Sequence, residues 1–580
     1  MSGIGGIMLR EGSPSDPLLF AMAKSLEHRG PDKISGEIYD QVGFIHTRLS
    51  VIDLEGGAQP LHGENLALIA NGAIYNYVEL REAFPDYAFK TQSDFESIIL
   101  LYQQYAAQFV DHLRGMYALA LYDNAKKTLY LSRDPFGIKT LYYWEGINGI
   151  AFASEPQALL KANLLSPHLN QAKVPSLLSL NYTWGRETLY QGIQRVMPGE
   201  TIMIQKGRIQ KRFLRAALPK GPPNTLSRDE GLSEIDRILD RSVEVHLRSD
   251  VPLGLILSGD MDSSCLLKLM SRHTSEPIKT FSVSLPSKTD EKNVTNVLKT
   301  EHEKVTFDEK DFWTLLPHTI AALDDPTLDI SAVPLYKMAQ EAKKSVKVLL
   351  SSEGGNELFG GYKRYERAKR PWWLGGALLI NDEALKGLGV MRGQFSSLWK
   401  ERDDFVPVFE AQNFTRLQIA QAIDYEAFLP NDLLLKLDRC LMAHGIEGRT
   451  PFLDIGVVET FFNLPDKFKI DKRTFQWLLR EWMHLNFPES ESFAKPKDFT
   501  LSVSEWILSK GKEIGFLVAH QEGVSHLCHS DRVQSLFLSS NKTAQRFAWA
   551  LLGFALWHQI HILKIPPNGD AFATLVKPLF

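Results

Sequence analysis

Residues 251–264 read VPLGLILSGDMDSS. An apolar run of the kind that forms a buried strand leads directly into a serine–glycine turn, after which a helix can begin. Backbone N–H groups in such a turn, together with the positive end of the helix dipole, form a seat for phosphate. Taken alone, this pattern is equally typical of an ordinary α/β turn, so the neighbouring sequence has to decide.

The sequence around this segment alternates apolar strands with helices. Runs rich in valine, isoleucine and leucine occur at residues 252–257, 278–283 and 346–350, and amphipathic stretches separate them. Strands that are apolar throughout are typical of parallel sheets covered by helices. The sequence therefore predicts an α/β domain with a parallel sheet and a helical C-terminal part. Five tryptophans are expected to pack the helical part: Trp477, Trp482, Trp506, Trp549 and Trp557.

Residues 1–205 show a different pattern, in which short strand-like runs are separated by turn signals. This pattern predicts stacked antiparallel sheets with a few helices, one of them at 95–105. A polar stretch with several prolines, 219–228, is the best linker candidate. The clearest strand-like runs are 42–52, 66–70, 117–122, 128–132 and 149–153. The expected division is a first domain at 1–205, a linker at 206–228, a second domain at 229–565 and a tail at 566–580 without an interpretation.

Composition restricts the possible partners and location. A chain of 580 residues with net charge −4 and no long basic run lacks the electrostatic footprint of a nucleic-acid-binding protein. The N-terminus shows no signal peptide, and the longest apolar run, 547–557, is shorter than the roughly 20 residues that span a bilayer. Three scattered cysteines, Cys265, Cys440 and Cys528, are expected to be reduced thiols. We therefore expect a cytoplasmic protein that binds neither nucleic acid nor membrane.

Three further segments make the interpretation of 251–264 specific. Residues 347–362 read KVLLSSEGGNELFGGY, residues 436–454 read KLDRCLMAHGIEGRTPFLD, and residues 494–500 read AKPKDFT. With SGDMDSS at 258–264, these segments resemble, in this order, the asparagine synthetase family and its relatives the β-lactam synthetases. The resemblance covers nearly the whole chain.

The resemblance implies that the second domain is an N-type ATP pyrophosphatase with ATP and Mg²⁺ as cofactors. Such a domain activates a carboxylate as an acyl-adenylate, releases pyrophosphate, and lets an amine displace AMP. Its chemistry requires a pyrophosphate cradle and cations that stabilise charge in the transition state. The implied roles are a cradle of Ser258, Gly259, Ser263 and Ser264, further ATP contacts at Leu257, Val283, Ser351 and Ser352, a Mg²⁺ ligand at Asp262, an acid/base at Glu353 and a catalytic lysine at Lys497.

Two departures from the family pattern fall in this site. Asp260 replaces the second glycine of SGG, and Asn356 replaces an aspartate that binds Mg²⁺ in the family. A neutral amide is a poorer ligand for a hard cation, and a carboxylate beside phosphate is unfavourable. One hypothesis is compensation, with Asp260, Asp262 and Asn356 together forming the metal site. The alternative is drift in a site that no longer makes asparagine.

The same resemblance covers residues 1–160. HRGPD at 28–32, RLSVID at 48–53, NGAIYNY at 71–77 and RDPFGIKTLYY at 133–143 resemble a class II glutamine amidotransferase domain. The implied fold is the N-terminal-nucleophile sandwich (αββα), in which a cysteine after the initiator Met attacks glutamine. The implied remnants of the glutamine pocket are an oxyanion hole at Asn71 and Gly72, a carboxylate-binding Arg48, and an ammonium-binding Asp94.

Two departures weaken this glutaminase. Ser2 stands where the family has its cysteine, and a hydroxyl is far less acidic than a thiol with pKa about 8.5. An adjacent base can activate serine, and Ser2 could also be an engineered substitution, so this change alone does not decide. Ala73 replaces a glutamate that helps to hold glutamine. Together the two changes predict a domain that persists as scaffold without hydrolysing glutamine.

Three functions remain open at this point. The leading one is an ATP-dependent ligase that joins a small carboxylate to ammonia or another amine, in a specialised biosynthetic pathway. The second is glutamine-hydrolysing asparagine synthesis, and the third is a non-catalytic scaffold partner. The acid is expected to contact loops 325–333 and 445–450. Family members are often dimers, so a homodimer is also open.

Overall fold

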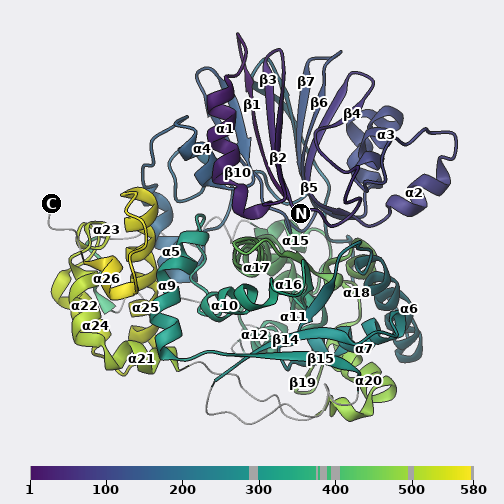
Figure 1. Ribbon diagram of the computed structural model, residues 1–580. Helices are drawn as coiled ribbons and strands as arrows, with labels where there is room; N and C mark the ends of the chain where they lie inside the picture. Colours follow the sequence, from purple (N-terminus) through teal and green to yellow (C-terminus); the bar gives the residue numbers. More distant parts are fainter. Residues whose placement is uncertain are drawn as a thin grey trace.

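The computed structural model describes residues 2–285, 298–371, 373, 376–378, 388–393, 405–493 and 502–576. These residues form two parts, which lie one above the other in Figure 1. The strands of the first 214 residues form the upper part, in purple and blue. Most of the remaining chain, in teal to yellow, forms the lower part.

The upper part contains two six-stranded sheets in which every neighbouring pair is antiparallel. The first sheet has the order β10-β8-β9-β1-β3-β2, with β1 Ser2–Leu9, β2 Lys33–Tyr39, β3 Val42–Arg48, β8 Tyr142–Gly146, β9 Gly149–Ala153 and β10 Ile193–Arg195. The second has the order β12-β11-β7-β6-β5-β4, with β4 Leu61–Gly63, β5 Leu66–Ile74, β6 Gly115–Asp123, β7 Thr128–Arg133, β11 Glu200–Gln205 and β12 Arg208–Leu214. The predicted antiparallel sheets are therefore confirmed.

The two sheets pack against each other and are covered by helices on their outer faces. Side chains such as Phe44 and Tyr122 belong to one buried cluster between the sheets. Helices α1 (Asp16–Ser25) and α4 (Pro156–Lys161) pack on the first sheet, and α3 (Glu96–Tyr105) packs on the second (Figure 1). The layers therefore follow the order helix, sheet, sheet, helix. Strand β12 falls within the stretch 206–228 that was expected to be a linker. It pairs with β11 at the edge of the second sheet and so belongs to the upper part.

The lower part is built on a five-stranded sheet that is parallel throughout, as predicted. Its order is β15-β14-β13-β16-β17, with β13 Leu253–Ile256, β14 Ile278–Ser284, β15 Thr300–Thr306, β16 Val348–Leu350 and β17 Glu447–Arg449. The accompanying helices include α6 Arg228–His246, α7 Met261–His273, α9 Glu309–Ala322, α10 Ala332–Ala342, α11 Gly355–Phe359, α12 Lys363–Lys369, α16 Arg416–Ile423, α17 Leu434–Met442, α18 Ile455–Phe461 and α20 Trp477–Asn486. Helix α16 continues into α17 through a π-helical stretch, Asp424–Leu433.

The C-terminal helices surround α25 (Lys542–Trp557), which is buried from Phe547 to its end. They comprise α21 Val503–Ser509, α22 Gly511–Ala519, α23 Glu522–Ser525, α24 Ser530–Phe537 and α26 Ala571–Leu575. Of the five predicted packing tryptophans, Trp482, Trp549 and Trp557 are buried, and Trp477 and Trp506 are half-buried. Three of the five residues of helix α26 are buried, so part of the stretch expected to be a tail is folded.

Two predictions from composition are also addressed by the fold. The three cysteines are all buried and carry free thiols. Within the described ranges, no helix combines the length and the apolar character needed to cross a membrane.

Candidate functional site

The two phosphate-site motifs meet at one edge of the parallel sheet. Strands β13 and β16 are neighbours, although β14 and β15 come between them in the chain. The chain therefore changes direction across the sheet here, which is where ligands bind in open parallel sheets. A Cβ atom placed on Gly355, which follows β16, would lie 3.0 Å from Cγ of Asp262, which follows β13. The two predicted segments therefore form a single site.

The turn after β13 has the form expected of a phosphate seat. Gly259 has φ +81°, in the region that favours glycine, and helix α7 begins two residues later. The hydroxyl of Ser258 donates to that of Ser263 at 3.1 Å, and Ser263 and Ser264 donate to the Asp260 carbonyl at 2.9 and 3.1 Å. These bonds fix the turn, while the first N–H groups of the 13-residue helix lack partners within the helix.

Asp262 is the centre of a hydrogen-bonded cluster that the sequence did not reveal. The side-chain amide of Gln476 donates to its two carboxylate oxygens at 2.7 and 2.9 Å, and lies 3.3 Å from Oδ1 of Asn356. Gln476 has φ +53° and is buried, at the N-terminus of α20. Burial raises the pKa of Asp262 to about 7, against the opposing effect of the Gln476 hydrogen bond.

The fit of this cluster to Mg²⁺ is partial. Three oxygens of Asp262 and Asn356 converge on the Gln476 amide nitrogen, and oxygen is the ligand type that Mg²⁺ prefers. Asp260 lies close enough for its charge to raise the pKa of Asp262. In the part of the chain that the structure describes, no three His, Cys, Asp or Glu side chains come together as a metal site. These oxygens could hold the cation where the Gln476 amide now lies, so the predicted metal set stays a prediction.

Glu353 lies on the other side of the site, directly after β16. Its half-buried carboxylate makes no hydrogen bond with any described residue, and burial raises its pKa. The charge of Lys436 of α17 opposes this rise in pKa, and Lys436 itself binds Asp329 at 2.6 Å and Ser331 at 2.9 Å. An unbonded carboxylate with a raised pKa is suited to accept a proton.

The remaining predicted ATP contacts lie around this edge. The N–H of Leu257 donates to the carbonyl of Phe281 at 2.8 Å, and Val283 follows on the same strand β14. The N–H of Ser351 donates to the carbonyl of Arg449 at 2.8 Å, and the carbonyl of Ser352 accepts from Gly355. Lys497 lies outside the described residues.

A second site surrounds Ser2 at the start of β1. Ser2 is buried, and its N–H donates to Oδ1 of Asn71 at 3.0 Å. The Nδ2 group of Asn71 is buried and has no hydrogen-bond partner among the described residues, so a donor is available beside Ser2. Gly72 has φ +136°, and a Cβ there would lie 2.0 Å from the Met116 carbonyl, so only glycine fits.

The other predicted pocket residues are present but already engaged. Arg48 lies opposite Ser2 in the strand register and donates to the carbonyls of Leu54, at 3.2 Å, and Asp53. Asp94 accepts from the Ile74 N–H at 2.7 Å, and burial raises its pKa to about 6. The pocket that joins Ser2, Arg48, Gly72, Ala73 and Asp94 has a volume of about 30 Å³. Since one water needs ~10–15 Å³ by this measure, the pocket holds a water or two.

Three pocket residues were missed by sequence reasoning. His46 is fully buried, neither of its ring nitrogens has a partner among the described residues, and burial lowers its pKa to about 3. Glu447 and Arg449 reach the same pocket from β17 of the other part. They fall within a segment already singled out, but nothing local indicates that the segment crosses to Ser2.

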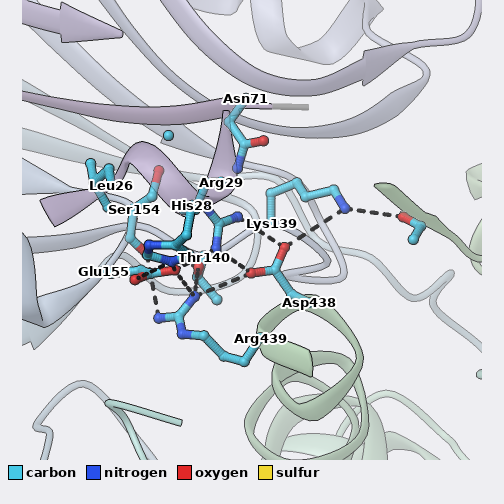
Figure 2. Close-up of polar contacts among 12 residues, drawn as sticks. Leu26, His28, Arg29, Asn71, Lys139, Thr140, Ser154, Glu155, Asp438 and Arg439 are labelled. Atoms are coloured by element: carbon cyan, nitrogen blue, oxygen red, sulfur yellow. Dashed lines mark hydrogen bonds and ion pairs between the residues drawn. The ribbon is translucent and has the colours of Figure 1, made fainter. Parts of the chain in front are cut away.

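A network of buried ion pairs joins the two parts of the chain next to this pocket (Figure 2). Arg29 donates to the Ser2 carbonyl at 3.3 Å, to Glu155 at 2.7 Å, and to both carboxylate oxygens of Asp438 at 2.8 and 3.1 Å. Next in the chain, Arg439 binds Asp438 at 3.1 Å and Asp324 at 2.9 Å. Helix α17 therefore contacts the Ser2 side through Asp438 and the Glu353 side through Lys436.

The fold and these two sites define a two-domain ligase of the amidotransferase type. The chain belongs to the asparagine synthetase family: the family described as asparagine synthase matches residues 234–559, and the family described as glutamine amidotransferase domain matches residues 1–214. It is an ATP-dependent carbon–nitrogen ligase.

Similarity to curated relatives extends over almost the full length. Asparagine synthetase [glutamine-hydrolyzing] 1 of Bacillus subtilis is 30% identical, over 97% of this chain and 97% of its own. A putative asparagine synthetase [glutamine-hydrolyzing] of Mycobacterium tuberculosis is 29% identical over 95% of both chains. Asparagine synthetase B [glutamine-hydrolyzing] of Escherichia coli is 27% identical over 84% of this chain and 79% of its own.

Proposed function

We propose that the protein adenylates a small carboxylate with ATP and transfers the acyl group to ammonia or another amine that its own first domain does not supply. The observation that carries this proposal is the contrast between the two sites. The site between β13 and β16 has the turn suited to phosphate, Asp262, and Glu353 without a hydrogen-bond partner among the described residues. The Ser2 pocket lacks a thiol, lacks the carboxylate at Ala73 and has room for a water or two.

In this mechanism the turn at 258–264 binds the pyrophosphate of ATP through backbone N–H groups and hydroxyls. The acid attacks the α-phosphorus, and pyrophosphate leaves. Glu353 then accepts a proton from the incoming amine as its nitrogen bonds to the acyl carbon and AMP departs. Mg²⁺, when bound by Asp262 and Asn356, neutralises phosphate charge. Lys497 is proposed to stabilise charge on the transferring phosphate.

The domain division is part of the same proposal. The helix–sheet–sheet–helix layers support an N-terminal-nucleophile (αββα) assignment for the first domain, and the parallel sheet supports the N-type ATP pyrophosphatase assignment for the second. Strand β12 favours a first domain that ends at Leu214 rather than at 205. A cytoplasmic location and a specialised pathway are further parts of the proposal.

The test is release of AMP and pyrophosphate by the purified protein. It is incubated with Mg²⁺·ATP, ammonium chloride or another amine, and a panel of carboxylic acids that includes aspartate, and glutamine is tested separately. Acid-dependent AMP with added amine but not with glutamine is expected. Equal rates with glutamine would contradict an inactive first domain. No AMP with any acid would favour a scaffold role, which is the second candidate because the Gln476 amide lies where the oxygens of the predicted metal site converge.

A further inference from the structure

A large cavity lies next to the reaction site. It has a volume of about 440 Å³ and lies between the segment around Tyr182, the loop that contains Asp329, and helices α16 and α25. Aromatic side chains of Tyr182, Phe428 and Trp549 contribute to its wall. The Trp549 indole N–H is bonded to the Leu328 carbonyl at 2.6 Å, so it is not a donor for a ligand in the cavity.

The cavity is far larger than ammonia requires. A molecule of that size occupies ~30 Å³ in the liquid, whereas cavities of ~300–1,000 Å³ hold ligands of drug size. Aspartate and ammonia together would leave most of 440 Å³ unfilled. The size therefore indicates a substrate with a substantial apolar body.

One end of the cavity is acidic and adjoins Glu353. Asp329 and Asp432 line it, and each lies close enough to Glu353 for their charges to interact. Lys436, bound to Asp329 at 2.6 Å, is the cation of this group, so three carboxyl groups share one ammonium. Burial and the charge of Asp329 raise the pKa of Asp432, and a second ammonium placed at this end would oppose that rise by stabilising the carboxylate. This end of the cavity favours a cationic amine near the predicted base.

The rim carries the opposite charge. Arg546 of α25 lines the cavity, is exposed, and makes no hydrogen bond or ion pair with a described residue. The other arginine of the lining, Arg364, is already bound to Asp424 at 2.8 Å. An anionic group on a ligand that reaches the rim would therefore meet an available guanidinium at Arg546.

We propose that this cavity binds an organic primary amine with an aromatic or apolar body and an anionic group at its far end, and that this amine is the nucleophile. The bound ammonium first loses one proton to solvent, its nitrogen then forms the bond to the acyl carbon, the bond from that carbon to the AMP oxygen breaks with its electron pair on AMP, and the second proton passes to Glu353. This assignment rests on the ligase function proposed above and names the class of its amine.

Binding is tested on the full-length protein by isothermal titration with three probes: 4-(2-aminoethyl)benzoate, 4-ethylbenzoate and ammonium chloride. Only 4-(2-aminoethyl)benzoate combines an amine, a ring and a carboxylate at the far end of the ring, so it is expected to bind most tightly. Ala420→Phe, which fills the cavity from α16, should abolish this binding, and Arg546→Ala should weaken it by about fivefold. Arg208→Ala, at an exposed arginine of the other part, is the control and should leave it unchanged.

Activity separates failure of this assignment from failure of the ligase function. AMP release with ammonium in wild type and Ala420→Phe alike, together with no binding of 4-(2-aminoethyl)benzoate, would overturn the organic-amine site and leave the ligase. Binding of 4-(2-aminoethyl)benzoate that is lost in Ala420→Phe would support the site even if AMP release failed with every acid, and that failure would count against the ligase. Equal binding of 4-ethylbenzoate and 4-(2-aminoethyl)benzoate would overturn the role of the acidic end.

Discussion

Gln476 donates its side-chain amide to both carboxylate oxygens of Asp262, at 2.7 and 2.9 Å. The two residues are 214 positions apart and meet at the edge of the parallel sheet. The amide nitrogen also lies 3.3 Å from the Asn356 oxygen, so a neutral donor occupies the point on which these oxygens converge. The charge of Asp262 therefore depends on a residue outside the family motifs quoted above.

Gln476→Leu should destabilise the protein more at pH 8 than at pH 5. It removes the donor from a buried carboxylate, and an unsatisfied buried group costs about 1–3 kcal/mol, or more when charged. Since the pKa of Asp262 is about 7, the carboxylate is charged mainly at pH 8. Urea unfolding at both pH values measures the difference, with the exposed Gln210→Leu as control. A loss of equal size at both pH values would contradict this role.

Asp262→Asn should change how stability depends on pH. Burial raises the Asp262 pKa from 3.8 to about 7, so between these values the folded state binds more protons than the unfolded state. Its contribution to stability therefore falls as pH rises through this window, by at most ~4 kcal/mol. The free energy of unfolding of the variant relative to wild type, measured with urea, should therefore rise from pH 4 to pH 8. A constant difference would mean that Asp262 ionises normally.

Glu353→Gln should lower the rate of AMP release by about 10²- to 10⁴-fold, because an amide cannot accept the proton of the amine. ATP binding, measured as the ATP-dependent rise in melting temperature, should remain. Glu357→Gln is the matched control: this buried neighbour is bonded to Tyr362 at 2.5 Å and has no role in the mechanism. Equal losses in the two variants would show a general effect of charge.

Ser2→Cys should not restore glutamine hydrolysis. The thiol is a better nucleophile, but Ala73 still supplies no carboxylate and the pocket of about 30 Å³ remains too small for glutamine. Glutamate release should stay at the wild-type level, while mass spectrometry after iodoacetamide reports whether the new thiol is reactive. Glutamate release by the single variant would show that the serine alone had silenced the domain.

Arg29→Met should destabilise the protein by about 3–5 kcal/mol, because it removes one of the two buried arginines that pair with Asp438 and Glu155 and leaves part of their charge uncompensated. Arg29 lowers the pKa of both carboxyl groups, so its contribution is present at neutral pH and is lost as pH falls. Lys24→Met removes an exposed pair with Glu27 and should cost less than about 1 kcal/mol. Similar unfolding midpoints for the two variants would contradict the structural role of the network.

Much of the fold was predictable because it is encoded locally. The runs at 149–153 and 278–283 coincide with β9 and β14 to within a residue, since apolar patterning and turn residues determine strands over short distances. Helix α26 was missed because a five-residue segment carries no clear period.

The candidate sites were predictable only where a motif supplied the residues. Asp262, Asn356 and Glu353 were named from motifs, and the parallel sheet brings them together. Gln476 and Glu447 could not be assigned, because their partners come from distant segments and no periodicity records such pairs. The cavity beside Glu353 was unpredictable for the same reason.

Helix α17 has a consequence for how such a chain can shrink during evolution. Its nine residues present Lys436 to Asp329, on the side of Glu353, and Asp438 to the buried Arg29 of the first domain. Deleting the first domain would expose this helix and remove counter-charges from Asp438 and Arg439. A gene shortened in this way would therefore encode a ligase whose helix α17 carries buried charges without partners. Retention of the whole first domain can thus be explained by stability alone, whether or not that domain hydrolyses glutamine.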